Sequence, residues 1–346
     1  MNIEPMASES DYRTSLFAVG IELDGDGFHP ADVLRKRVNA AENAGFTFAT
    51  FDDSLAPERP VPGGRIDAVT RAAFVAPRTS TLGLVPVVAA TYAEPFHLSS
   101  QLATLDYASC GRAGWLAAND PATARAWGAT ELRTEAEISR ERVDSIEVAR
   151  RLWDSWEDDA VVRDYAAGKF LNRDKLHYAD FTGTTFSVKG PAIVPRPPQG
   201  QVVVFAYETT GSDGVDVALV SGATVPDALA AVDQARTSGV PRVLVDLEIA
   251  LGAEPSRTSG TNSSARLHFS GSTADLTVLL TDLAARADGV RLHPASIDAD
   301  LPKLSRHVLP ALLRSGHAHR PVPGSTLRAN LGLPRPVNRF AKELNR

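Results

Sequence analysis

The segment LGLVPVVAA (82–90) indicates the class of fold. It contains no charged or hydrogen-bonding side chain, which is typical of a strand covered on both faces, as in a parallel sheet. Runs of related character stand at SLFAVGI (15–21), FATFDDS (48–54) and AGWLAA (113–118). Apolar residues have helical spacing in the stretches between, at 30–45 and 65–76. This half of the chain therefore predicts strands that alternate with helices.

The second half continues the pattern. Its apolar runs are VVVFAY (202–207), VDVALVS (215–221), RVLVDLEIAL (242–251) and DGVRLH (288–293). Helices are predicted at 226–238, 272–287 and 300–315. Strands that mostly alternate with helices predict an α/β protein, most simply a closed (β/α)8 TIM barrel formed by residues 1–346 as one domain. An open doubly wound sheet is the alternative, but no strand is followed by the G-x-G-x-x-G pattern.

Three segments depart from this alternation of strands and helices. Residues 154–200 are rich in charge and then in Gly and Pro, which predicts an insertion after the fourth βα unit, with a hairpin at FTGTTFSVKG (181–190). The Ser/Thr/Gly-rich stretch 252–265 is expected to be a mobile loop. The proline-rich segment 321–346 is expected to be an arm that packs over the barrel or over a partner.

Two helices of the first half have recognisable boundaries. Thr91 and Glu94 have the spacing of a capping box, which predicts a helix from about residue 92. A longer helix is predicted over 135–153, with apolar residues on one side and charges elsewhere.

Composition excludes several classes of protein. Lys and Arg number 36 against 42 Asp and Glu, and this net charge of −6 disfavours a nucleic-acid partner. No apolar run is long enough for a transmembrane helix, and the N-terminus lacks the features of a signal peptide. The single cysteine, Cys110, suits the reducing cytoplasm and excludes a cysteine-based zinc site. No metal site is predicted, and the close pair His317 and His319 is interpreted as part of a surface loop.

Four blocks resemble the luciferase-like flavin-dependent monooxygenases, in the nitrilotriacetate and dibenzothiophene-sulfone monooxygenase branch. They are TYAEPFHLSSQLATLDYASCGRAGW (91–115), LWDSWEDDAVVRD (152–164), DKLHYADFTGTTFSVKGPAIVPRPPQGQ (174–201) and GSTLRANLGLPRP (324–336). The order and spacing of these blocks follow the family along the chain. The region 207–265 is shortened and hard to align, so the chain resembles a divergent member.

The resemblance implies a fold and an activity. The family fold is a TIM barrel, which agrees with the strand count. Its members take reduced FMN from a separate flavin reductase and use O2 to oxidise a small organic substrate. It also implies a homodimer in the cytoplasm, and the segment 321–346 is long enough to reach a neighbouring copy. The catalytic residues and the identity of the substrate are not predicted.

The resemblance places flavin contacts at the ends of the predicted strands. Asp53 matches the family's acidic residue beside the flavin, although Asp52 or Asp53 also suits the cap of the next turn. Ala90 and Thr91 lie where small residues let the backbone approach the ring, although a capping role already explains Thr91. Arg112 is a candidate for the flavin phosphate, or for a pair with an acidic neighbour.

The phosphate loop is expected directly after the fifth strand. There the chain reads AYETTGSDG (206–214), in which Thr209, Thr210 and Gly211 are the candidate phosphate contacts. A plain surface turn is the other interpretation. Tyr207 stands where the family has glycine, and Glu208 adds a negative charge beside the expected phosphate.

Two further departures weaken the expected flavin site. Leu116 occupies a position where relatives have an amide that hydrogen-bonds the flavin, and Asn119 is a candidate replacement for that contact. Ser139 replaces an aromatic residue. These changes predict weak binding of FMN. They also leave a second hypothesis, a non-catalytic barrel that acts as a partner subunit or ligand-binding module with weak or no flavin binding.

Overall fold

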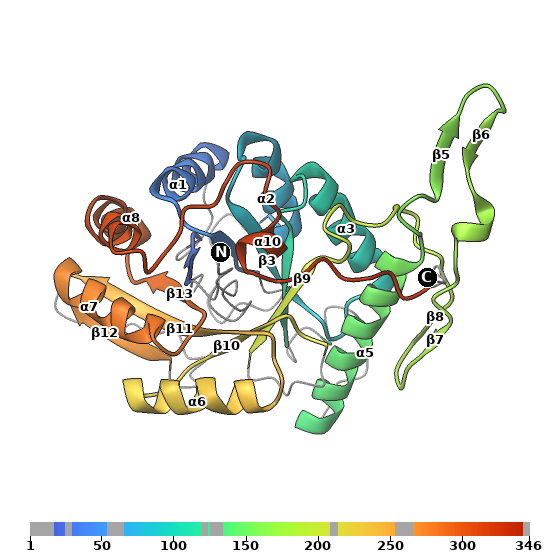
Figure 1. Ribbon diagram of the computed structural model, residues 1–346. Helices are drawn as coiled ribbons and strands as arrows, with labels where there is room; N and C mark the ends of the chain where they lie inside the picture. Colours follow the sequence, from blue (N-terminus) through green and yellow to red (C-terminus); the bar gives the residue numbers. More distant parts are fainter. Residues whose placement is uncertain are drawn as a thin grey trace, which may run out of the picture.

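The computed structural model describes residues 17–24, 30–53, 66–119, 124, 134–207, 214–252 and 266–341. Within these ranges, parallel strands close into one barrel, with helices on its outer side (Figure 1). The barrel strands are β1 (Ala18–Glu22), β2 (Phe48–Phe51), β3 (Gly83–Ala89), β4 (Gly114–Ala118), β9 (Val203–Tyr207), β10 (Val217–Val220), β11 (Arg242–Leu251) and β13 (Gly289–Pro294).

The strands pair in the order of the chain. β1 pairs with β2, and the sequence β2, β3, β4, β9, β10, β11, β13 continues until β13 pairs back with β1. All eight apolar runs form barrel strands, so the predicted TIM barrel is confirmed and the open sheet is excluded.

The barrel sheet contains one more strand, which was not predicted. β12 (Leu267–Gly271) runs parallel to the second half of β11, beyond the part of β11 that pairs with β10. Its burial alternates residue by residue, with His268 and Ser270 exposed. It therefore lacks the continuous apolar run that marks the barrel strands.

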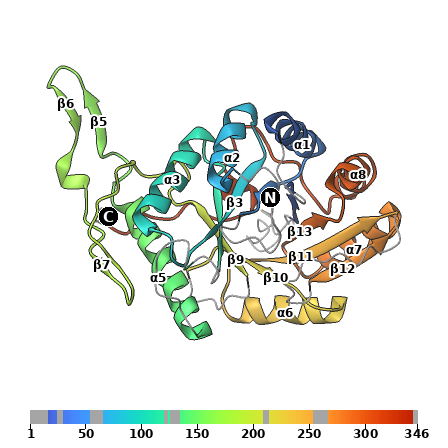
Figure 2. The same cartoon turned by 180° about the vertical axis from the view of Figure 1, so that it is seen from behind.

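Helices cover the outside of the barrel, as Figure 2 shows from the opposite side. They are α1 (Ala31–Ala44), α2 (Ala68–Val75), α3 (Pro95–Ala108), α5 (Glu135–Asp154), α6 (Val225–Thr237), α7 (Thr273–Ala284) and α8 (Ile297–Lys303). α8 continues through a π-helical segment, Leu304–Val308, into α9 (Leu309–Arg314). Short 3-10 segments lie at Ala76–Arg78 and Arg173–Lys175. None of the helices in the described ranges is long and apolar enough to cross a membrane.

The start of α3 differs from the prediction. The capping box expected between Thr91 and Glu94 is wrong, because the helix begins at Pro95 and Glu94 is its cap. The Glu94 carboxylate accepts hydrogen bonds from the backbone N–H groups of Phe96 (3.1 Å) and His97 (2.6 Å). Proline suits the first helical position because it has no N–H to satisfy and a fixed φ.

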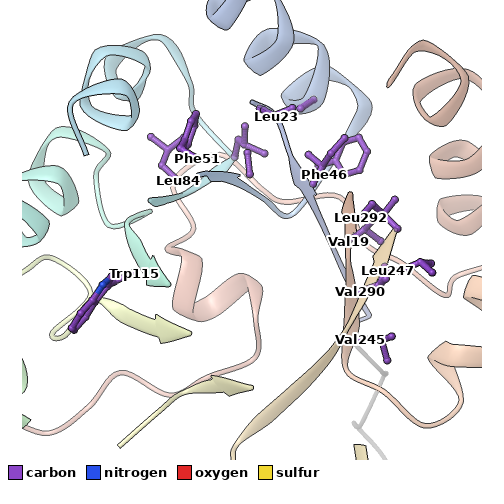
Figure 3. Packing of buried hydrophobic residues seen from close by; sticks show 14 of the residues in the cluster. Val19, Leu23, Phe46, Phe51, Leu84, Trp115, Val245, Leu247, Val290 and Leu292 are labelled. Atoms are coloured by element: carbon purple, nitrogen blue, oxygen red, sulfur yellow. The ribbon is translucent and has the colours of Figure 1, made fainter. Parts of the chain in front are cut away.

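Two apolar clusters lie on the two sides of the barrel wall. The outer cluster packs strand side chains such as Val19, Leu247 and Leu292 against the helices (Figure 3). The inner cluster fills the barrel itself, where the rings of Phe48 and Phe205 are 5.2 Å apart. The interior is thus a packed core at this level and not a pore.

Residues 155–200 leave the barrel between α5 and β9. They contain two antiparallel hairpins, β5 (Val161–Asp164) with β6 (Lys169–Leu171), and β7 (Phe181–Thr182) with β8 (Ser187–Val188). The second is the hairpin predicted at 181–190. The first projects away from the barrel in both views (Figures 1 and 2). The predicted loop 252–265 lies, apart from Gly252, outside the described residues.

The C-terminal segment closes one end of the chain's own barrel. Its short helix α10 (Leu327–Asn330) lies against the starts of β3 and β4, where a Cβ on Gly83 or Gly114 would lie 2.6 or 3.1 Å from the Leu327 side chain. Leu327, Leu331 and Leu333 join the inner cluster. The interior is therefore closed at the amino ends of these strands.

Candidate active site

The opposite end of the barrel, at the carboxyl ends of the strands, is called the mouth below. Ligand sites of TIM barrels lie at this end, because the loops after the strands converge there. Several of these loops, at 25–29, 54–65, 120–123, 208–213 and 253–265, lie outside the described residues. Within the described residues, the mouth is formed by the strand ends.

Strand alternation brings charged side chains into the interior near the mouth. On β11, Val245 and Leu247 belong to the outer cluster (Figure 3). Because side chains alternate along a strand, Asp246 between them faces inward. By the same alternation, Arg291 and His293 of β13 face inward. Charged groups buried inside a barrel cost free energy unless they are paired.

Asp246 is the centre of a hydrogen-bonded network. Its Oδ1 accepts from Arg291 Nε at 2.7 Å and lies 2.7 Å from His293 Nε2. Its Oδ2 accepts from Arg291 at 2.9 Å and from Arg266 Nε at 3.0 Å. Although burial opposes ionisation, Arg291 and His293 hold the pKa of Asp246 well below its usual range. Asp246 is therefore a carboxylate whose two oxygens are both occupied.

The network fixes the state of His293. Burial lowers the pKa of His293 to about 4, against the opposing pull of Asp246, so the imidazole is neutral at pH 7. An ionised carboxylate only accepts hydrogen bonds, so Nε2 carries the proton that is donated to Asp246. The other nitrogen, Nδ1, then has a free lone pair and no hydrogen-bond partner among the described residues.

Tyr207, the last residue of β9, completes the network. Its hydroxyl oxygen accepts from an Arg291 N–H at 2.7 Å, and its ring lies 5.2 Å from the guanidinium carbon. Burial raises the pKa of Tyr207, so the phenol stays protonated. Because its oxygen already accepts from Arg291, its own O–H remains to donate to another group. Asp246 and Arg291 thus hold one hydrogen-bond donor, the Tyr207 O–H, and one acceptor, His293 Nδ1, near the mouth.

The wall formed by β3 and β4 has a different character. Its inward residues are small or apolar, with Ala89 and Ala118 paired in register at the strand ends and Val87 paired with Leu116 below them. Thr50 Oγ1, on β2 between the outward-facing Ala49 and Phe51, is buried in the interior without a partner in the described part of the chain. Asn119 Oδ1, just after β4, is also buried without a described partner, but strand alternation places Asn119 on the side of Trp115 and Ala117 in the outer cluster. A buried polar atom without a partner is costly, so Thr50 Oγ1 is suited to a bound group.

The ends of β1 and β2 are held by another ion pair. Arg71 of α2 pairs with Asp24 and also donates to the carbonyl of Asp52. The Asp53 carboxylate accepts from the backbone N–H of Ala68, the first residue of α2, at 2.7 Å. Asp53 thus stands at the mouth and is bound to the start of the next helix.

The structure separates the other residues predicted to bind flavin. Ala90 faces the outer cluster, its carbonyl accepts from the Ser145 hydroxyl at 2.7 Å, and Thr91 beside it is fully buried. Leu116 is buried in the inner cluster below the mouth. Thr209, Thr210 and Gly211, with Glu208, lie outside the described residues. Ser139 lies near the start of α5.

Arg112 lies before β4, at the amino ends of the strands and away from the mouth. Its guanidinium donates to the carbonyls of Leu82 (2.7 Å), Thr79 (2.8 Å) and Ala76 (3.2 Å) and to the Thr79 hydroxyl (2.9 Å). The structure pairs it with neutral oxygens and not with an acidic neighbour. These bonds join the start of β4 to the segment that precedes β3.

Sequence reasoning did not select Asp246, Arg291 or His293. A signal was present, because RVLVDLEIAL and DGVRLH carry charged or ionisable residues at alternate positions of otherwise apolar strands. Two such strands that become neighbours place these side chains on the same face. Among the described residues, no three His, Cys, Asp or Glu side chains are grouped as metal ligands would be.

Comparisons with known proteins show which family this chain resembles. Residues 14–234 match the family model described as luciferase-like monooxygenase. The dibenzothiophene-sulfone monooxygenase of Rhodococcus erythropolis is 40% identical over 135 residues, which are 38% of this chain and 30% of that one. One of the subunits of pristinamycin IIA synthase from Streptomyces pristinaespiralis is 32% identical over 309 residues, 89% of this chain and 91% of that one.

A solved structure extends the likeness of fold. EDTA monooxygenase from Chelativorans sp. BNC1 superposes with a TM-score of 0.76 at 20% identity, covering 92% of this chain and 99% of that one. The matches to the first curated relatives cover only 30% to 48% of those proteins' own length.

Proposed function

The chain belongs to the luciferase-like monooxygenase family, and from that membership we propose that it is a reduced-flavin-dependent monooxygenase. It takes reduced FMN from a separate flavin reductase and oxidises a small organic substrate with O2. It is a homodimer in the cytoplasm. When bound, reduced FMN supplies the electrons with which O2 is activated, and the protein supplies placement and the exclusion of water.

The observation that carries the proposal is the division of the mouth into two unlike sides. The side chains of Ala89 and Ala118 leave room for a flat ring at the ends of β3 and β4. Thr50 Oγ1, which has no partner among the described residues, lies deeper in the interior on the neighbouring strand. The residues present therefore fit a flavin ring on this side.

The polar network at the ends of β9, β11 and β13 suits the substrate. The neutral His293 accepts a hydrogen bond at Nδ1, and the Tyr207 hydroxyl donates one. Asp246 and Arg291 hold both groups in place, which reduces the ordering required when a substrate binds. The closed far end of the barrel, filled by Leu327 and its neighbours, shields the interior from water.

Anaerobic titration with photoreduced FMN tests this proposal. We expect a saturable complex, weakened by Ala118→Leu, which fills the space left for the ring. Ala167→Leu, an exposed change on the hairpin β5–β6, is the matched control. On mixing with O2, the complex should reoxidise its flavin with kinetics that differ from those of free reduced FMN. If no complex forms, the chain is instead a non-catalytic barrel of the same family.

A further inference from the structure

Glu248 of β11 carries a charge near the mouth that the network around Asp246 does not use. Leu247 and Ile249, on either side of it, belong to the outer cluster, so Glu248 faces inward, two residues beyond Asp246. It is partly buried, and its carboxylate forms no hydrogen bond or ion pair with any residue of the described ranges. Glu248 therefore presents a negative charge that is left to a ligand.

His293 stands beside Glu248 on the neighbouring strand. The two residues are partners in the register of β11 and β13, so their side chains lie on the same face of the sheet. The neutral His293 donates from Nε2 to Asp246 at 2.7 Å, which leaves the Nδ1 lone pair as an acceptor. Glu248 and His293 thus offer two adjacent acceptors, and no donor in the described part of the chain satisfies either of them.

We propose that Glu248 and His293 bind a protonated amine of the substrate, which is therefore a small organic ammonium compound. An ammonium group has N–H donors and no acceptor, so it suits a carboxylate and a neutral imidazole lone pair. Its hydrogen bond to the carboxylate joins two charged groups, which makes it stronger than a bond between neutral groups. This inference rests on the proposed function, because it names the class of substrate that the same site takes.

The surroundings of Glu248 favour an ammonium over other charged ligands. The arginines of this face, Arg266 and Arg291, are both bound to Asp246. A negative group beside Glu248 would therefore lie against an unpaired charge of its own sign, which is unfavourable. A metal ion needs more ligands than these two, and the described ranges contain no group of three His, Cys, Asp or Glu side chains placed to hold one.

The other neighbour of Glu248 shows how a charged ligand reaches it. His268 of β12 is the partner of Glu248 in the register of β11 and β12, on the same face, and it is exposed. Glu248 thus lies between solvent on the side of His268 and the buried network on the side of His293. A charged ligand can therefore reach the carboxylate without crossing the apolar wall of β3 and β4.

Calorimetric titration of the full chain with three probes of similar size tests the inference. The probes are benzylammonium, benzyl alcohol and benzoate. We expect benzylammonium to bind about tenfold more tightly than either of the others, because only it donates to Glu248 with a charge. Glu248→Gln should remove this preference. Asp282→Asn, an equal change of charge at an exposed position of α7, is the matched control and should keep it.

Reversing the charge gives a sharper test. Glu248→Lys should bind benzoate more tightly than benzylammonium, an exchange of preference that a loss of folding does not produce, and circular dichroism should show the same fold in all variants. A wild type without a preference for benzylammonium, including one that binds none of the probes, overturns the inference. So does a preference that survives Glu248→Gln.

The titration with reduced FMN judges the proposed function separately. A wild type that binds reduced FMN but does not prefer benzylammonium keeps the proposed function and overturns the substrate class. A wild type that prefers benzylammonium but does not bind reduced FMN supports the amine site and overturns the proposed function.

Discussion

Both ends of the barrel contain a buried arginine–aspartate pair, but the two pairs have different surroundings. At the closed end, Arg328 of α10 binds both oxygens of Asp216 at 3.0 and 3.1 Å, and the pair lies between the C-terminal segment and the strands. Near the mouth, Arg291 and Asp246 hold Tyr207 and His293. The first pair joins two parts of the chain, whereas the second holds hydrogen-bonding groups at the end of the barrel where we propose that the substrate binds. The role of the same chemical pair therefore depends on the groups around it.

The largest effect is expected at the closed end. Arg328→Ala leaves Asp216 buried with Arg150 as its remaining ion-pair partner, and releases α10 from the barrel. Removing one partner of a buried pair costs about 3–5 kcal/mol of the free energy of unfolding. Urea unfolding measures this loss. Arg335→Ala, which removes a surface ion pair on the same segment, should cost less than about 1 kcal/mol. Equal losses of unfolding free energy in Arg328→Ala and Arg335→Ala would show that the Arg328–Asp216 pair does not stabilise the contact of α10 with the barrel.

His293, which is bound to Asp246 near the mouth, should make the stability of the protein depend on pH. The pKa of His293 is about 4 in the folded protein, against 6.5 for an unperturbed histidine. Between these values the unfolded chain binds more protons, so stability rises with pH from 4 to 6.5 and is lost as pH falls. The difference amounts to about 3 kcal/mol.

His293→Gln isolates this contribution. Glutamine keeps a donor for Asp246 but does not titrate, so its unfolding free energy should rise less steeply between pH 4 and 6.5 than that of the wild type. Urea unfolding at several pH values measures both slopes. Parallel curves for the two proteins would contradict a neutral, buried His293.

A smaller loss of stability is expected when the Tyr207 hydroxyl is removed. Tyr207→Phe leaves one Arg291 N–H without its acceptor, which costs about 1–3 kcal/mol of stability. Thermal unfolding measures it. Tyr178→Phe, at a residue that is 56% exposed, is the matched control and should change stability by less than about 0.5 kcal/mol. A Tyr207→Phe variant as stable as this control would mean that water replaces the hydroxyl at no cost.

The smallest effect concerns the apolar side of the mouth. We expect the purified protein to be colourless, because oxidised FMN binds weakly where the chain has Leu116 and Ser139. Ala118→Leu should weaken binding of reduced FMN about tenfold, which corresponds to about 1.4 kcal/mol. The absorption spectrum of the purified protein tests its colour, and quenching of protein fluorescence in an anaerobic titration measures the binding of reduced FMN. A purified protein that is yellow and contains stoichiometric FMN would contradict the prediction of weak binding.

The local pattern of apolar residues was sufficient to predict the barrel. Continuous apolar runs such as 82–90 and 202–207 mark strands whose two faces are both covered, and this covering is needed wherever the sheet closes. β12 escaped prediction because its exposed His268 and Ser270 remove that signal. The boundary of α3 was misjudged because two rules competed, and Pro95 decided the start over the spacing of Thr91 and Glu94.

The sequence by itself determined which segments become the barrel strands and which become the main helices around them, because these depend on side chains a few positions apart. It also determined that Arg112 precedes a strand, and the structure places it at the end away from the mouth. Only the tertiary structure decided which charged residues meet. Asp246 and Arg291 are 45 positions apart, and they pair because β11 and β13 are neighbours in the closed barrel. Likewise Leu327 fills the chain's own barrel because closure leaves an apolar opening at the amino ends of the strands. Contacts of this kind depend on the path of the whole chain, which no local pattern contains.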